Sequence, residues 1–192
     1  NAPAVASLEL VPWYRALARQ TAHALWFDEL EALWTNASLL AVSPDGKLFL
    51  ENLPLSTDDA IERVPWFVGE CSPTSLVRLL PSVGEDAFLH DDQNVWTGVF
   101  VSGEATLRLA RGEVRIVEES HLLENGRVEW RIEPEGAFAF ALHVRIPRWA
   151  ESGVRLGVNG ELARMTVDHG DEPGTYLSYA RTWKRGDRFT LE

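Results

Sequence analysis

Apolar side chains recur at three- and four-residue steps between Ser7 and Val42. Residues with this spacing share one face of a helix, so the segment is predicted to form an amphipathic helix. Pro12 is expected to start or kink an early turn of it. The apolar stripe consists of Ala22, Leu25, Trp26, Leu30, Leu33, Trp34, Ala37 and Leu40.

Turns and short elements follow the helical segment. Ser43-Pro44-Asp45-Gly46 has the residue types of a β-turn, and a short strand is expected at Leu48–Leu50. A short helix is predicted to carry Leu76, Val77, Leu79 and Leu80, with Ser72 as its N-cap and Pro73 as its first residue. Cys71 would then lie one residue before the N-terminus of that helix.

The period changes from 3.6 to 2 beyond an acidic, turn-rich stretch at residues 84–93. We place a domain boundary there, with residues 1–92 in a first domain and residues 93–192 in a second. Short strands separated by turns predict an antiparallel β-sandwich, so the fold class is α+β. The predicted strands are Ala105–Leu109, Val114–Val117, Val128–Ile132, Phe138–Ile146, Val154–Val158, Tyr176–Trp183 and Arg188–Leu191.

Charge and composition narrow the range of partners. The net charge is −11 and the pI about 4.9, so nucleic acid and membrane surfaces are not expected partners, whereas a neutral carbohydrate is compatible. The single cysteine, Cys71, excludes an intrachain disulfide and a cysteine-based metal cluster made by this chain alone. Residues 1–7 lack the basic region of a signal peptide, and a cytoplasmic location is our expectation. Both ends of the sequence look truncated.

Several segments, taken together, resemble glycoside hydrolase family 127, the β-L-arabinofuranosidase-like enzymes. They occur in the family's order and at about its spacing, and the ordered series is more specific than any one member. The segments are Ser43–Lys47, Glu51–Leu55, Pro65–Phe67, Cys71–Thr74, Leu76–Leu80, Gly103–Leu107, Arg145–Ala150, Val158–Glu161 and Arg181–Asp187.

The resemblance implies a catalytic (α/α)6 barrel followed by β-sandwich domains, with residues 1–92 as the end of the barrel. It also implies a retaining mechanism in which a cysteine thiolate, matching Cys71, is the nucleophile. In the family this thiolate is held on zinc by a Glu and further cysteines, and a separate Glu is the acid/base. Here Ser72 and Gly69 stand where the family often has cysteine, and the segment with the other ligands and the acid/base would precede Asn1. We therefore expect no cofactor in this chain.

Each candidate site residue also has a structural interpretation. Cys71 could be a small buried apolar side chain instead of a nucleophile. Glu70, Trp66 and Phe67 could line a sugar pocket, and Glu70 could also be a general acid/base. A solvated loop carboxylate is the favoured interpretation of Glu70, and the aromatic rings could serve core packing. The five histidines lack metal-ligand spacing, and His143 is interpreted as a core or surface imidazole.

The function expected from the sequence is that of part of a retaining glycoside hydrolase acting on a terminal sugar such as a β-L-arabinofuranoside. The alternative is a non-catalytic β-sandwich module that binds carbohydrate or protein. This chain alone is expected to be inactive, because the resemblance implies that the acid/base precedes Asn1. The apolar helix stripe leaves a homo-oligomer open as an assembly.

Overall fold

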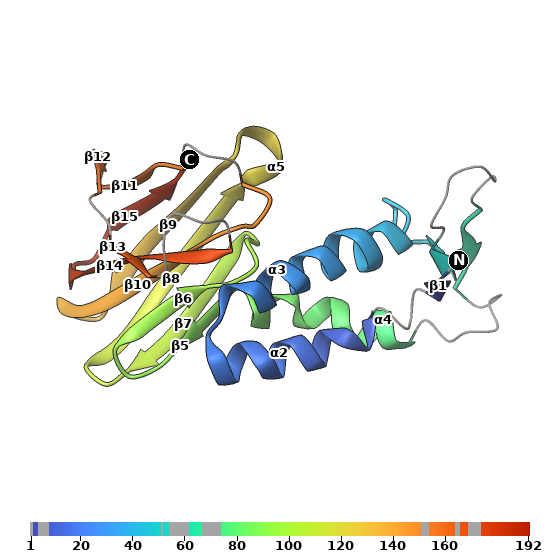
Figure 1. Cartoon of the computed structure of the whole chain (residues 1–192), viewed down its shortest axis with the longest axis horizontal. Helices are drawn as coiled ribbons and strands as arrows, with labels where there is room; N and C mark the ends of the chain where they lie inside the picture. The colour runs from blue at the N-terminus through green and yellow to red at the C-terminus, as the bar shows by residue number, and fades with distance from the viewer. Residues whose placement is uncertain are drawn as a thin grey trace. The chain divides into compact units, whose positions relative to one another are not determined.

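The computed structural model describes residues 8–50, 62–66, 74–150, 154–163 and 174–192, and the backbone at 2–3, 52–53 and 166–168. The chain forms two compact units. One contains residues 1–21 and 26–83, and the other contains residues 22–25 and 84–192. We call them the helical unit and the sandwich unit, and Figure 1 shows the elements of each.

The helical segment is interrupted at Ala22, where the sequence predicted one continuous helix. One helix was expected from Ser7 to Val42, but Ala22 has a φ of 48°, in the left-handed region that a right-handed helix cannot continue through. Nδ1 of His23 then accepts the N–H of Leu25 at 3.2 Å, which satisfies a free donor where the next helix begins. The elements are α2 (Leu10–Thr21), α3 (Ala24–Leu33) and a π-helical segment, Trp34–Leu39.

The apolar stripe supplies much of the core of the helical unit. Leu30, Trp34 and Ala37 are buried, whereas Leu40 is 48% exposed. The guanidinium of Arg15 lies 5.9 Å from the centroid of the Trp34 ring, so α2 and the π-helical segment are in contact. The stripe is thus a packing surface for most of its length.

Short strands and a second helical region complete the helical unit. β2 (Leu48–Phe49) pairs antiparallel with β4 (Val64–Pro65), which confirms the strand predicted near Leu48. β1 (Ala2–Pro3) pairs with β3 (Asn52–Leu53). α4 (Thr74–Leu79) confirms the predicted short helix, and a 3-10 segment, Leu80–Asp86, follows it. The predicted cap, Ser72 with Pro73, lies outside the described residues.

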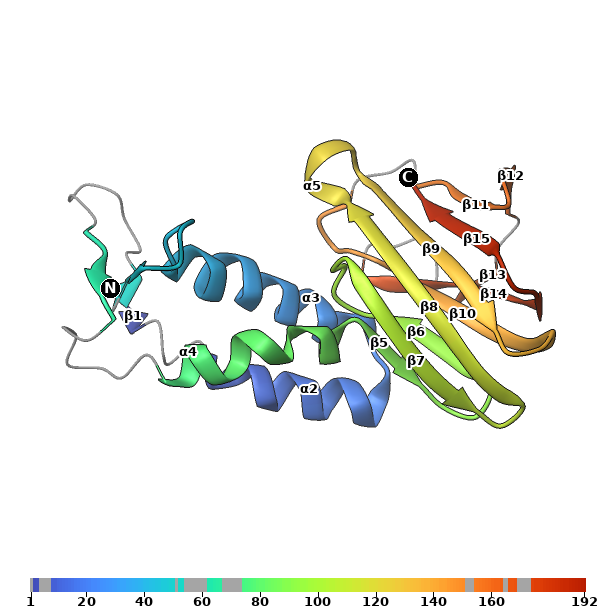
Figure 2. The ribbon, with the colours of Figure 1, turned by 180° about the vertical axis from the view of Figure 1, so that it is seen from behind.

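The sandwich unit contains two sheets (Figures 1 and 2). One has the strand order β13-β14-β10-β6-β5 and the other β12-β11-β15-β9-β8-β7. A four-residue helix, α5 (Leu122–Asn125), connects β8 to β9. The strands are β5 (Phe88–His90), β6 (Asn94–Thr97), β7 (Gly103–Leu109), β8 (Gly112–His121), β9 (Arg127–Pro134), β10 (Phe138–Ile146), β11 (Leu156–Val158), β12 (Glu161–Leu162), β13 (Thr166–Asp168), β14 (Thr175–Trp183) and β15 (Asp187–Leu191).

Alternation along each strand explains why the two sheets pack together. In β9 every second side chain is buried, and the same holds for the first half of β10, because successive side chains point to opposite faces of a sheet. The inner faces meet in one core, which confirms the mixed α+β fold with sheets packed as a sandwich. Its largest members are Trp130, Phe138, Phe140, Trp183 and Phe189.

Two local features of the sandwich are a parallel strand pair and a tight hairpin. β6 pairs with β10 in parallel, across Ala141–His143, whereas the other pairs of these two sheets are antiparallel. Asn159 and Gly160 have φ of 53° and 85°, the left-handed values that a two-residue hairpin between β11 and β12 requires. The Asn-Gly pair is the residue combination that favours such a turn.

Candidate functional site

The segment predicted to carry the nucleophile lies between two described elements of the helical unit. β4 and Trp66 precede it, and α4 follows from Thr74. Cys71, Glu70 and Phe67 lie outside the described residues. Of the four predicted site residues the structure therefore places Trp66.

Trp66 is half-buried and held at both its ring face and its nitrogen. Its ring stacks on Phe49 with centroids 5.2 Å apart and planes 16° apart. Its Nε1–H donates to the carbonyl oxygen of Gly46 at 2.8 Å. These contacts fix the indole against β2 and the preceding turn, so Trp66 has a structural role. Its contact with a sugar stays a prediction.

The turn that receives this hydrogen bond is itself ordered by side chains. Ser43 Oγ donates to Asp45 Oδ1 at 2.6 Å, and the amide of Lys47 donates to the same oxygen at 3.1 Å. The hydroxyl of Ser43, followed by that amide, lowers the pKa of Asp45 below its ordinary value. The turn predicted from Ser43-Pro44-Asp45-Gly46 thus provides a firm support for Trp66.

Side-chain hydrogen bonds also fix α4 and the segment after it. Buried Ser75 donates its hydroxyl hydrogen to Glu9 Oε1 at 2.9 Å. Arg15 Nη2 donates to the carbonyl oxygen of Ser82 at 2.7 Å. Residues before and within α2 therefore hold the region just beyond the predicted nucleophile.

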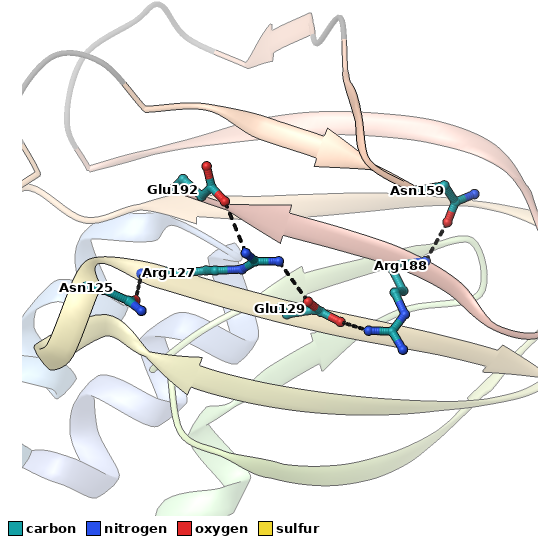
Figure 3. A network of polar contacts seen from close by, with 6 residues as sticks. All are labelled: Asn125, Arg127, Glu129, Asn159, Arg188 and Glu192. Carbon is teal, nitrogen blue, oxygen red and sulfur yellow. Dashed lines mark hydrogen bonds and ion pairs between the residues drawn. The ribbon is translucent and has the colours of Figure 1, made fainter.

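The outer face of the six-stranded sheet carries alternating charges (Figure 3). Glu129 on β9 accepts from Arg127 and from Arg188 of β15, and Arg127 also pairs with Glu192 at 3.5 Å. Asn159 Oδ1 accepts the amide of Arg188 at 2.8 Å, which joins the β11–β12 hairpin to this network. The pairs Arg188–Glu129 and Arg127–Glu192 link β9 to β15 and to the residue that follows it, which is a structural role.

The outer face of the five-stranded sheet carries a chain of hydrogen bonds through His143. Its Nδ1 is 2.6 Å from Ser178 Oγ, and its Nε2 is 3.1 Å from Asn94 Oδ1. Trp96 stacks on the imidazole, with centroids 4.9 Å apart and planes 12° apart. His143 is therefore a partly buried network residue, more specific than the core or surface imidazole expected from its neighbours in sequence.

The buried ionisable side chains of the sandwich unit include Glu118 and Arg145. Glu118 is 1% exposed, and burial raises its pKa to about 8, against the opposing effects of the Trp130 N–H, the Val101 amide and Arg145. Arg145 is fully buried and donates from Nε to the carbonyl oxygen of Gly98 at 2.8 Å. At neutral pH we expect Glu118 to be largely protonated.

Residues 94–192, which include both sheet faces described above, match the model of the β-L-arabinofuranosidase GH127 middle domain. This chain belongs to glycoside hydrolase family 127. The family resemblance inferred from the ordered segments is thereby confirmed. A comparison with curated proteins gave no match.

Solved structures of family 127 resemble the chain beyond the matched region. A GH127 β-L-arabinofuranosidase from Geobacillus stearothermophilus T6 is 26% identical, with a TM-score of 0.85 over 98% of this chain and 31% of its own. The GH127 β-arabinofuranosidase BT3674 is 26% identical, with a TM-score of 0.86 over 99% of this chain and 32% of its own. The chain thus spans about a third of the length of these enzymes, and the similarity includes its helical unit.

The zinc that the family resemblance implies would need about four converging ligands. The candidates near the predicted nucleophile, namely Cys71, Glu70 and Glu51, lie outside the described side chains. Elsewhere, among the residues that the structure does describe, no three His, Asp or Glu side chains are grouped to hold a metal ion. The described side chains do not form a zinc site, and we assign no catalytic step to a metal.

Among the residues that the structure describes, no helix is both long and apolar enough to cross a bilayer.

Two features of this family-127 domain were missed from the sequence. The hydrogen-bonded chain through His143 joins positions 94, 143 and 178, which come together only through the strand register. Glu118 stands in an alternating strand at an inward position after Val114 and Ile116, and that alternation could have indicated its burial.

Proposed function

We propose that this chain is part of a retaining glycoside hydrolase that removes a terminal sugar, such as a β-L-arabinofuranosyl group, with Cys71 as the nucleophile. The similarity to two GH127 arabinofuranosidases over 98% and 99% of the chain is the observation that carries this proposal. It includes the helical unit, in which Cys71 lies, as well as the sandwich unit. In this proposal α2, α3 and α4 belong to a helical (α/α)6 barrel.

The chemistry assigned to Cys71 is a two-step displacement. The thiolate attacks the anomeric carbon, a carbon–sulfur bond forms, and the bond to the leaving oxygen breaks as a general acid protonates that oxygen. Water then attacks the same carbon from the side opposite the sulfur and gives a proton to the conjugate base of that general acid. The carbon–sulfur bond breaks, which returns the thiolate and releases the sugar with retained configuration. No residue of this chain is assigned as the general acid.

Three neighbours of Cys71 are proposed to line the sugar pocket. Trp66 is half-buried, so part of its indole remains accessible while its contacts with Phe49 and Gly46 hold the ring in place. Phe67 would extend this aromatic surface, and Glu70 would accept hydrogen bonds from sugar hydroxyls. Such a wall would orient the anomeric carbon towards the sulfur.

The test uses the complete protein that contains this chain and an aryl β-L-arabinofuranoside. We expect Cys71→Ala to abolish turnover, whereas Ser72→Ala, one residue away, should keep it. Rapid quenching of the unmodified enzyme should add the mass of one pentosyl group to the peptide containing Cys71. Full activity in Cys71→Ala, or the pentosyl group on another residue, would show that the nucleophile has been assigned wrongly.

A further inference from the structure

A partly open pocket of about 310 Å³ lies in the sandwich unit beside the first residues of β10. β6 pairs with β10 only across Ala141–His143, so the start of β10 at Phe138 extends beyond β6. The segment before β6 and the turn between β7 and β8 border the space that remains. The pocket is therefore a consequence of the short parallel pairing.

Small side chains form the base of the pocket. Ala139, Ala141 and Ala180 line it. Ala139 and Ala141 lie on the outer sheet face because they alternate with inward-facing Phe138, Phe140 and Leu142, and Ala180 shares that face because it is directly opposite Ala141. Their methyl groups leave room above the sheet that larger side chains would fill. They also offer an apolar surface to the C–H groups of a ligand.

One wall of the pocket is fixed before any ligand arrives. Asn94 lines it, and its Nδ2 donates to both carboxylate oxygens of Asp91 at 2.9 Å. Its Oδ1 faces Nε2 of His143, and because an amide oxygen can only accept, that ring nitrogen carries the proton. Nδ1 of His143 lies 2.6 Å from the hydroxyl oxygen of Ser178, within hydrogen-bonding distance. This chain of bonds across β6, β10 and β14 preorganises the wall.

Other polar side chains in the lining are available to a ligand. Asp92, Gln93 and Arg111 line the pocket and are exposed. Within the described part of the chain, none of these three side chains has a hydrogen-bond or ion-pair partner. Arg108, on the same hairpin as Arg111, is in contrast paired with Glu113 at 2.6 Å. The pocket thus combines a hydrogen-bonded wall with donor and acceptor groups that have no partner in the described part of the chain.

These groups suit a neutral polyhydroxylated ring. A carboxylate, a primary amide and a guanidinium can each bind two adjacent hydroxyls, and together they supply donors and acceptors. A polyanion is disfavoured by Asp92 and by the net charge of −11. The volume is at the lower end of the ~300–1,000 Å³ range of ligand pockets, which fits a small ligand.

We propose that this pocket is a glycan-binding subsite that holds one neutral sugar residue. The choice of an arabinose-containing glycan rests on the proposed function, whereas the pocket itself does not. The site would hold a glycan chain near the enzyme without taking part in bond cleavage.

Arabinotriose is the probe, titrated into the 15N-labelled 192-residue chain and followed by amide chemical shifts. We expect the shifts to concentrate at Gln93, Ala110 and Ala141. Arg111→Ala and Gln93→Ala should each weaken binding by about fivefold or more, the loss expected for one or two ligand hydrogen bonds. The matched control, Arg108→Ala, removes the same charge three residues earlier and should leave the affinity unchanged.

A substitution that fills the pocket tests the subsite without changing its charge. Ala180→Trp at an exposed position should fill the pocket and abolish binding, while unchanged amide spectra elsewhere verify the fold. Equal effects of Arg111→Ala and Arg108→Ala, or full binding by Ala180→Trp, would overturn the subsite. So would binding by this chain that is lost in the complete protein, because the pocket would then be covered there.

Different experimental outcomes would reject the subsite and the proposed function. Cys71→Ala in the complete protein should retain arabinotriose binding while losing hydrolysis. Hydrolysis without measurable binding at the pocket would reject the subsite and leave the function standing. Binding at the pocket in a protein that hydrolyses no arabinofuranoside would support the subsite and reject the function.

Discussion

Trp130 donates its indole N–H to the carboxyl group of Glu118, directly opposite it on the neighbouring strand, at 2.9 Å. Both side chains are buried in the sandwich core. This pairing gives Glu118 a hydrogen-bond partner but does not offset the cost of burying a charge, so its pKa is raised to about 8. The proton on Glu118 is therefore linked to the stability of the sandwich.

We predict that Glu118 makes the fold less stable as pH rises. The folded-state pKa of about 8 exceeds the ordinary value of 4.5, so between these values the folded chain holds a proton that the unfolded chain releases. The stabilisation is complete below pH 4.5 and is lost as pH rises through 8. Glu118→Gln should remove this dependence and gain on the order of a few kcal/mol relative to wild type between pH 5 and pH 9.

Urea unfolding at a series of pH values measures this difference. Glu119→Gln, at the adjacent exposed position, is the control and should follow the wild-type pH dependence. If the curves of Glu118→Gln and wild type stay parallel across the range, Glu118 does not titrate as its burial implies.

The hydrogen bond from Trp66 to Gly46 gives a second prediction. Trp66→Phe keeps a ring to stack on Phe49 but removes the donor, so we expect a loss of about 1 kcal/mol in the free energy of unfolding of the helical unit. Trp13→Phe is the control, because Trp13 is 62% exposed and its change should stay within about 0.5 kcal/mol. Denaturant midpoints compare the two, and equal losses would contradict a supporting role for Trp66.

The ion pairs on the outer face of the six-stranded sheet should contribute little to the free energy of unfolding, and this contribution should depend on the salt concentration. Glu129→Gln breaks contacts with Arg127 and Arg188 and is expected to cost less than about 1 kcal/mol, because these guanidinium groups are exposed to solvent. The cost should shrink in high salt. Glu119→Gln removes an equal charge at the position opposite Glu129 without breaking any ion pair found in the described residues, and it should be neutral or slightly stabilising. Unfolding midpoints at low and high ionic strength distinguish the two, and a salt-independent loss would argue against ion pairing.

Isolated, the 192-residue chain should show no appreciable glycosidase activity. In the proposed mechanism no residue of this chain is assigned as the acid/base, and the proton transfer by such a group typically supplies ~10²–10⁴-fold in rate. The assay is release of the aryl group from an aryl β-L-arabinofuranoside, with Cys71→Ala as the blank. Turnover that disappears in Cys71→Ala would mean that the chain already contains a working acid/base.

Alternating polarity in the second half of the chain was sufficient to predict β7, β8, β9, β10, β11, β14 and β15, because a strand exposes side chains to two different environments in turn. The short strands β5, β6, β12 and β13 were not predicted. Local chemistry was also sufficient at the Ser43–Gly46 turn and at Asn159-Gly160, where the residues themselves favour the required backbone angles. The family, likewise, could be inferred from an ordered series of short segments. Cys71, by contrast, was proposed from the resemblance alone.

Tertiary structure alone decided the rest. The break at Ala22 leaves no gap in the apolar stripe, since a left-handed residue can occupy a position that also fits the helical pattern. The parallel pairing of β6 with β10 brings Asn94 beside His143, a contact between residues 49 positions apart that no local preference encodes. The sequence was enough to identify seven of the strands, but the register between distant strands determined which polar side chains meet and where a pocket remains. That register depends on how the whole core packs.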